Sequence, residues 1–255
     1  MMGSTTSLKG IVRGLVALLF WLLVWQIAAM QVGSVLFLPT PLQVLRRLAG
    51  LTVTAVFWQT ALFSLCRVAL GMLLGTCLGV VLAALTCTFR WADTIVSPAV
   101  SVIRATPVAS FILLVFLWTD KGQVPIIIAA LMVLPVVYGN VTRGIRERDP
   151  KLLELAQVYR FSQWKTARLV ILPSVRPYFF SAVTTSMGLA WKSGVAAEAL
   201  CWPKIAIGTQ IYNTKLYFET PDLFAWTLVV ILLSLGLERL VSLAVRAAER
   251  RGQHD

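Results

Sequence analysis

The residues with the clearest capacity for chemistry are the ionisable side chains inside apolar stretches. They are Arg67, Arg104, Lys192 and Glu198. A charge in hydrocarbon is costly, so each must face protein or water, and such residues often mark a substrate or ion pathway. The three cations would suit a small anion. For Arg67 we favour a structural role, with a backbone carbonyl or Glu198 as its partner, over contact with substrate.

The chain has few of the residues and motifs that catalysis, metal binding or ATP binding requires. The single histidine is His254, and the four cysteines form no C-x-x-C motif, so neither a disulfide framework nor a zinc site is indicated. No G-x-x-x-x-G-K-[ST] phosphate loop occurs, so any ATP that drives the protein is bound by another chain. A membrane-embedded enzyme is disfavoured because paired carboxylates and nucleophile motifs are also missing. We expect no catalytic residue, metal ligand or cofactor in this chain.

The composition is that of a membrane protein. Hydrophobic residues make up 58% of the chain and charged residues 13%, which is not a soluble globular profile. The net charge of +12 could indicate nucleic-acid binding. However, the charges lie at the ends of apolar runs, as the positive-inside rule predicts for membrane proteins. The expected fold is therefore an all-α polytopic membrane protein.

Apolar runs predict about six transmembrane helices. They lie near residues 11–30, 61–84, 96–118, 124–141, 179–200 and 223–243. Each can cross a hydrocarbon core of roughly 30 Å at about 1.5 Å per residue. The first run could be a signal peptide, but it is too long and has no clear cleavage site. We expect Pro107 to kink or break the third run and Pro135 to break the fourth.

Basic residues predict the sidedness of these helices. The presumed inner segments hold 14 basic residues and the outer ones five, which places residues 1–10, the loop at 143–176 and the C-terminus in the cytoplasm. The inner residues are Lys9 and Arg13, Arg90, eight from Arg143 to Arg176, and Arg246, Arg250 and Arg251 before the tail at 252–255. Residues 38–51 predict a proline-marked turn and a short helix at the outer surface. Residues 201–221 predict an outer loop. On the second helix, Gly71, Gly75 and Gly79 recur every fourth residue and predict a ridge where another helix approaches closely.

The loop at 143–176 reads as two short helices joined by a turn. Asp149 can cap a helix that begins at Pro150, and Ser162 can cap a second helix that Pro173 ends. One apolar face is predicted on the first helix, formed by Leu152, Leu155, Ala156 and Tyr159. Such a basic loop indicates a docking surface. The alternative is an amphipathic hairpin that lies on anionic lipid.

Within this loop, Glu154, Leu155 and Ala156, followed by Ile171-Leu172-Pro173, resemble the EAA loop of binding-protein-dependent ABC importer permeases. In that family a short coupling helix fits a cleft on a separate ATPase subunit. The resemblance implies that the ATPase-coupling residues are Glu154, Leu155, Ala156, Tyr159 and Arg160. This chain departs from the family pattern at Leu155, where the family has alanine, and at Arg160, where it has glycine. Arginine adopts a left-handed turn only at some cost.

Further segments are similar to permeases for sulfonates, taurine and nitrate. They are SLCRVALG, SVIRATPVASFILLVFLW, GLAWKSGVAAE and the proline-containing segment at 38–51. The resemblance implies a type I, MetI-like ABC permease fold over residues 11–251, in the bacterial inner membrane. The expected substrate is a small organic anion, such as a sulfonate, taurine or nitrate, or a vitamin precursor.

The resemblance also implies partners. These are a second, identical permease subunit, two ATPases that carry ATP and magnesium, and a substrate-binding protein that contacts residues 201–221 near Tyr212, Tyr217 and Phe218. The rival hypothesis is an ion-coupled secondary transporter, with Arg67, Lys192 and Glu198 as its site. Such transporters carry inverted repeats, and the two halves of this sequence show no convincing similarity.

Overall fold

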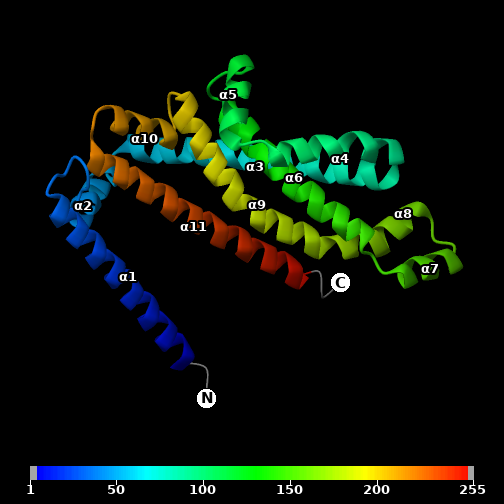
Figure 1. The fold of residues 1–255 in the computed structure, drawn as a ribbon. Coiled ribbons are helices and arrows are strands. Elements are labelled where there is room, and N and C mark those ends of the chain that lie inside the picture. Colours follow the sequence, from blue (N-terminus) through cyan, green and yellow to red (C-terminus); the bar gives the residue numbers. More distant parts are fainter. Residues whose placement is uncertain (1–4, 252–255) are drawn as a thin grey trace. The chain divides into compact units, whose positions relative to one another are not determined.

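The computed structural model describes residues 5–251, with side chains from 12 to 248, and every regular element in that range is helical (Figure 1). The helices are α1 (Thr5–Val32), α2 (Pro41–Thr52), α3 (Ala55–Thr88), α4 (Arg90–Ala105), α5 (Val108–Trp118), α6 (Val124–Arg146), α7 (Pro150–Val158), α8 (Gln163–Thr166), a π-helix (Ala167–Ile171), α9 (Leu172–Cys201), α10 (Ile207–Leu216) and α11 (Thr220–Arg251). The predicted all-α class is confirmed. The tail at 252–255, including His254, and residues 1–4 lie outside the described residues.

Among the described residues, four helices, α1, α3, α6 and α11, are long and apolar enough to cross a membrane. The bent pair α4 and α5 provides a fifth span if the two helices are taken together. Helix α9, the fifth predicted span, has 30 residues and is long enough to cross, but it is not apolar enough to be counted. The described residues therefore give four or five candidate spans rather than about six. Its serines, threonines, Lys192 and Glu198 make it more polar than the others.

The third predicted span, at 96–118, is not one continuous helix. The chain bends by 108° between α4 and α5, and Thr106, which lies between them, is extended, with ψ of 131°. Pro107 causes this break because its ring cannot donate an N–H and because it disfavours the helical conformation of the preceding residue. Conversely, Pro135 was expected to break the fourth span, but α6 continues through it. Packing of α6 along α9 compensates for the hydrogen bond lost at that proline.

The predicted outer loop at 201–221 contains a helix, α10. Trp202 ends α9 in the left-handed conformation, with φ of 51°. The Thr209 hydroxyl then donates to the Pro203 carbonyl over 2.7 Å, which stabilises the turn into α10. Sequence alone did not predict α10 because its ten residues carry only weak amphipathic periodicity.

The chain forms two compact units, and the first combines residues up to 58 with residues 210–230. The predicted short helix at 38–51 is α2, which begins with a capping box between Thr40 and Gln43. Arg47 of α2 makes a bidentate ion pair with Asp222 of α11. The Trp25 indole N–H donates to the Pro39 carbonyl over 3.0 Å. These contacts hold the turn between α1 and α2 within this unit.

The second unit comprises residues 59–209 and 231 onward. Within it, α6 and α9 run side by side (Figure 1). The glycines at 71, 75 and 79 place α3 against α6. A Cβ atom at Gly75 would lie 2.5 Å from the Ala130 carbonyl oxygen, and one at Gly79 would lie 2.9 Å from the Val137 Cβ. The backbones of α3 and α6 therefore approach too closely for any side chain at these positions.

Candidate functional site

Helix α7, in the loop predicted to dock, presents an uncovered apolar face. The Asp149 carboxylate accepts from the Lys151 backbone N–H over 2.9 Å and caps the helix, as the sequence predicted. Leu155 is 52% exposed and Tyr159 is 68% exposed, whereas Ala156 is buried. The face is therefore split: Ala156 packs on this chain, and the large apolar side chains point away from it. Such an exposed patch is typical of an interaction surface.

Arg160 stands in the left-handed conformation that glycine would adopt more easily, with φ of 49°. The Phe161 N–H bonds to the Ala156 carbonyl over 2.8 Å, and the Arg160 N–H bonds to the Gln157 carbonyl over 3.0 Å. These two bonds form a Schellman motif, in which glycine is the usual left-handed residue. The Lys165 ammonium lies 4.1 Å from the centroid of the Phe161 ring and supports the turn from its far side.

Replacement of Arg160 by glycine is expected to stabilise the end of α7 by about 1 kcal/mol, because glycine adopts the left-handed conformation without steric cost. Amide hydrogen exchange at residues 151–159 should slow about fivefold in Arg160→Gly if local opening governs it. The control is Arg148→Gly, outside the turn, which should not slow exchange there. Faster exchange in Arg160→Gly would show that the arginine side chain itself holds the turn.

The predicted end of the second short helix at Pro173 is wrong. Ser162 caps α8 as expected, accepting from the Lys165 N–H over 3.3 Å. The chain then passes through the π-helix Ala167–Ile171 and continues directly into α9. Pro173 lies in the first turn of α9, where its missing N–H costs little because the hydrogen-bond register changes there.

The two ends of the docking loop are tied together beside the membrane. Tyr178 of α9 donates to the Glu147 carboxylate over 2.7 Å, and Arg143 of α6 donates to it over 3.0 Å. The hydrogen bond from Tyr178, assisted by Arg143, lowers the pKa of Glu147. The Tyr178 ring also packs on Gly144, where a Cβ would lie 2.9 Å from it. These contacts join the end of α6, just before the loop, to the first turns of α9, just after it.

Glu198 lies at the centre of a buried polar cluster on α9, and its side chain is fully buried. Its carboxylate accepts from the Ser64 hydroxyl over 2.8 Å, from the Gly208 N–H over 3.2 Å and from Arg67 over 3.3 Å. Arg67 also donates to the Ile205 carbonyl over 2.6 Å. Both partners predicted for Arg67, a carbonyl and Glu198, are therefore present. The cluster joins α3, α9 and the start of α10.

Arg104 and Lys192 lie apart from this cluster. Arg104 donates to the Pro135 carbonyl over 2.5 Å and lines a pocket of about 400 Å³ with Thr106, Asn140 and Leu189. Lys192 follows Leu189 by one turn of α9 and is exposed. It makes no ion pair with the side chains that the structure describes. The sequence did not predict Thr106 and Asn140 as pocket residues, because nothing local places them beside Arg104.

Lys192 belongs to an exposed stripe on α9. Its members are Ser181, Thr185, Leu189, Lys192, Ala196 and Leu200. They recur at spacings of three and four residues and so occupy one helix face. The hydroxyls of Ser181 and Thr185 and the ammonium of Lys192 make this face of the helix polar enough to contact water. The spacing alone could have identified this stripe.

The sequence of residues 75–252 matches the family described as binding-protein-dependent transport system inner membrane component. This chain belongs to that family. It is also 30% identical over 244 residues to the permease protein SsuC of Bacillus subtilis (strain 168), which is named for aliphatic sulfonate transport. That alignment covers 95% of this chain and 87% of the relative.

Other relatives of this permease are named for other small anions or zwitterions. The taurine transport system permease protein TauC of Escherichia coli (strain K12) is 26% identical, with 89% of this chain and 83% of the relative covered. The bicarbonate transport system permease protein CmpB of Synechococcus elongatus is 25% identical, with 92% and 88% covered. The chain is thus a permease subunit of an ABC importer, a transport subunit of the membrane whose family works with ATPase and binding-protein partners.

Solved structures share the fold. An amino acid ABC transporter crystallised with histidines has a TM-score of 0.65 at 17% identity, with 78% of this chain and 97% of that chain covered. A bacterial ABC transporter for import of the acidic polysaccharide alginate has a TM-score of 0.65 at 17% identity, with 93% and 95% covered. These likenesses confirm the predicted ABC permease fold.

Proposed function

We propose that this permease uses α7 to couple ATP hydrolysis on a separate ATPase to the import of a small anion. The observation that carries the proposal is the exposed apolar face of α7, mounted on a loop whose ends are tied by Glu147 and Tyr178. A helix held in this way would let a partner chain that binds it move the rest of the permease. Lipid would cover the apolar face equally well but would deliver no directed force.

The coupling residues are Glu154, Leu155, Ala156, Tyr159 and Arg160. Leu155 and Tyr159 would enter the ATPase cleft, Glu154 is exposed beside them, and Ala156 anchors the helix from behind. Arg160 sets the turn that follows. The ATPases carry ATP and magnesium, so this chain needs no cofactor of its own and is not itself an enzyme.

We infer from the excess of basic residues that α7 and both termini lie in the cytoplasm of a bacterium, with the chain in its inner membrane. Two identical permease subunits would then form the path between them, two ATPases would bind from inside, and a substrate-binding protein would dock outside. Closure of the ATPases would move α7 and, through Glu147 and Tyr178, the ends of α6 and α9. The pocket beside Arg104, which is lined mainly by α4, α5 and α6 with Leu189 of α9, would open alternately to the two sides.

The coupling is tested by Leu155→Asp in the full transporter. A charge in the apolar contact should abolish co-purification of the ATPase and should lower ATP-driven uptake about a hundredfold, since a buried unpaired charge costs about 3 kcal/mol or more. The matched control is Gln157→Asp, which places the same charge on the opposite face of α7 and should retain the ATPase.

Two results would contradict the coupling proposal. One is full ATPase retention and uptake by Leu155→Asp. The other is uptake by wild-type vesicles without ATP under an ion gradient, which would favour the secondary transporter.

The proposed substrate class is supported by Arg104, Lys192 and the relatives named for sulfonate, taurine and bicarbonate transport. The Lys192 ammonium, on the polar face of α9, would contact an anion as it crosses the membrane. Lys192→Gln should raise the KM for sulfonate or taurine uptake about tenfold, the effect of losing one charge-assisted contact. Lys121→Gln, an exposed lysine outside α9 and outside the segment at 201–221, is the control. Unchanged uptake in Lys192→Gln would instead favour an uncharged substrate such as a vitamin precursor.

A further inference from the structure

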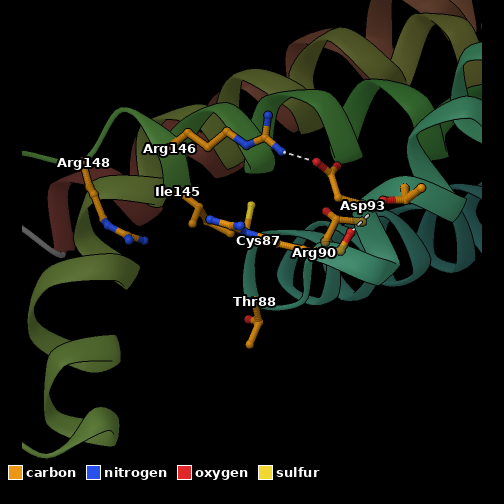
Figure 2. Close-up of a pocket in the computed structure, with 9 residues that line it drawn as sticks. Cys87, Thr88, Arg90, Asp93, Ile145, Arg146 and Arg148 are labelled. Carbon is orange, nitrogen blue, oxygen red and sulfur yellow. Dashed lines mark hydrogen bonds and ion pairs between the residues drawn. The ribbon is translucent and has the colours of Figure 1, made fainter.

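A basic hollow of about 550 Å³ lies between the end of α3, the start of α4 and the end of α6. Figure 2 shows Arg146 and Arg148 reaching it from the α6 side, while Arg90 and Asp93 reach it from α4. The transport mechanism proposed above uses none of these residues. All of them lie in one compact unit of the chain.

The hollow carries an excess of positive charge. Arg146 donates to the Asp93 carboxylate over 3.1 Å, so these two charges offset each other. Arg90 and Arg148 make no ion pair with any side chain between residues 12 and 248. Two guanidinium groups are therefore left to face the hollow, and guanidinium groups match the geometry of phosphate oxygens.

The start of α4 adds a second, independent feature. Its N-cap is Phe89, which makes no side-chain capping hydrogen bond, and Arg90 occupies the first helical position. Helix N-termini attract anions and disfavour cations, so an arginine at this position breaks a local rule. An anion held here would accept hydrogen bonds from the backbone N–H groups of the first turn and would also neutralise the charge of the arginines.

The surroundings of the hollow indicate a lipid. Phe89 is 45% exposed, Trp91 is 65% exposed and Ile95 is 65% exposed, all beside Arg90. Exposed aromatic residues next to basic ones are typical of the level of the membrane headgroups. Basic pockets between transmembrane helices on the cytoplasmic side bind anionic headgroups.

We propose that the hollow formed by Arg90, Arg148 and the start of α4 binds the phosphate of an anionic phospholipid headgroup. The phosphate of the lipid accepts hydrogen bonds from the backbone N–H groups at the start of α4. The acyl chains of the lipid lie along Trp91 and Ile95. The inner leaflet as the source of the lipid rests on the proposed inward orientation of the chain. The binding itself is measured without transport, so a failure of ATPase coupling and a failure of lipid binding are told apart.

The test is native mass spectrometry of the full chain purified in detergent, with phosphatidylglycerol or phosphatidylcholine added. Wild type should retain phosphatidylglycerol in preference to phosphatidylcholine. Arg90→Ala and Arg148→Ala should each lower phosphatidylglycerol retention about fivefold, and the double variant should lower it about twenty-five-fold. Arg246→Ala, an exposed arginine near the end of α11, should leave retention unchanged.

Two further arms keep the result interpretable. The Arg90→Lys/Arg148→Lys variant keeps the charges and should still prefer phosphatidylglycerol, which separates loss of binding from misfolding. Excess inorganic phosphate should displace little lipid. Complete displacement of phosphatidylglycerol by inorganic phosphate would reassign the hollow to a soluble phosphate, and equal retention by wild type and the double alanine variant would overturn the site.

Discussion

Arg67→Ala is expected to destabilise the permease by about 3–5 kcal/mol, the usual cost of leaving a buried charge without its partner. The Glu198 side chain is fully buried and Arg67 is 15% exposed, so water cannot replace the guanidinium. The Ile205 carbonyl loses its donor in the same variant. Both losses fall where α3, α9 and the start of α10 meet, so we expect the three elements to separate together.

A double-mutant cycle isolates the ion pair from the packing of the arginine stem. Glutamine at 198 can keep the hydrogen bonds with Ser64 and Gly208 without a charge. The double variant Arg67→Met/Glu198→Gln should therefore recover more than half of the stability lost in Arg67→Met alone, with Glu198→Gln as the other single variant of the cycle. The readout is the free energy of unfolding from titration with a denaturing detergent in mixed micelles.

Arg46→Ala, an exposed arginine on α2, should change that free energy by no more than about 0.5 kcal/mol. A loss of the same small size in Arg67→Ala would mean that the ion pair with Glu198 is not a structural element. The predicted structural role of Arg67 would then be wrong.

Local chemistry explains what the sequence could predict. Asp149 and Ser162 cap helices because their side chains reach backbone N–H groups two and three residues ahead. The left-handed Arg160 follows from the turn that must join two such helices. Long apolar runs identify the spans because only internally hydrogen-bonded helices can cross lipid.

Two errors fall on prolines, whose effect depends on tertiary packing. The break predicted at Pro107 is observed as a bend of 108° in the chain, whereas Pro135 leaves α6 continuous and Pro173 lies in the first turn of α9. The sequence around each proline is apolar and helix-forming, so it cannot tell a break from a tolerated position. Packing against neighbouring helices decides whether a proline breaks its helix, and α6 and α9 pack against each other.

Pairings across long sequence separations were predictable only in part. The pairing of Arg67 with Glu198 was expected because few partners exist for a charge inside a span. The pairing of Asp93 with Arg146 was not, because both lie among other charged residues near helix ends. The hollow beside them depends on how the ends of α3 and α6 meet the start of α4, which no local pattern encodes.

Gly75→Val is expected to lower the free energy of unfolding by roughly 3 kcal/mol or more, the upper range for overpacked sites. A Cβ at Gly75 would lie 2.5 Å from the Ala130 carbonyl oxygen and 2.8 Å from the Val133 Cβ. The first of these atoms belongs to the backbone of α6, so no side-chain rotation can relieve the clash. Helices α3 and α6 would have to move apart, opening a gap along the whole glycine ridge.

The graded control for this site is Gly75→Ala, which should cost about 1–3 kcal/mol because it introduces the clashing atom alone. Gly236 of α11 is the matched control, since nothing lies within 4 Å of its added Cβ. Gly236→Ala should be neutral or should stabilise the protein by up to about 1 kcal/mol through its higher helix propensity. Equal effects at the two glycines would show that helix propensity, rather than the close approach of α3 and α6, governs stability at this ridge.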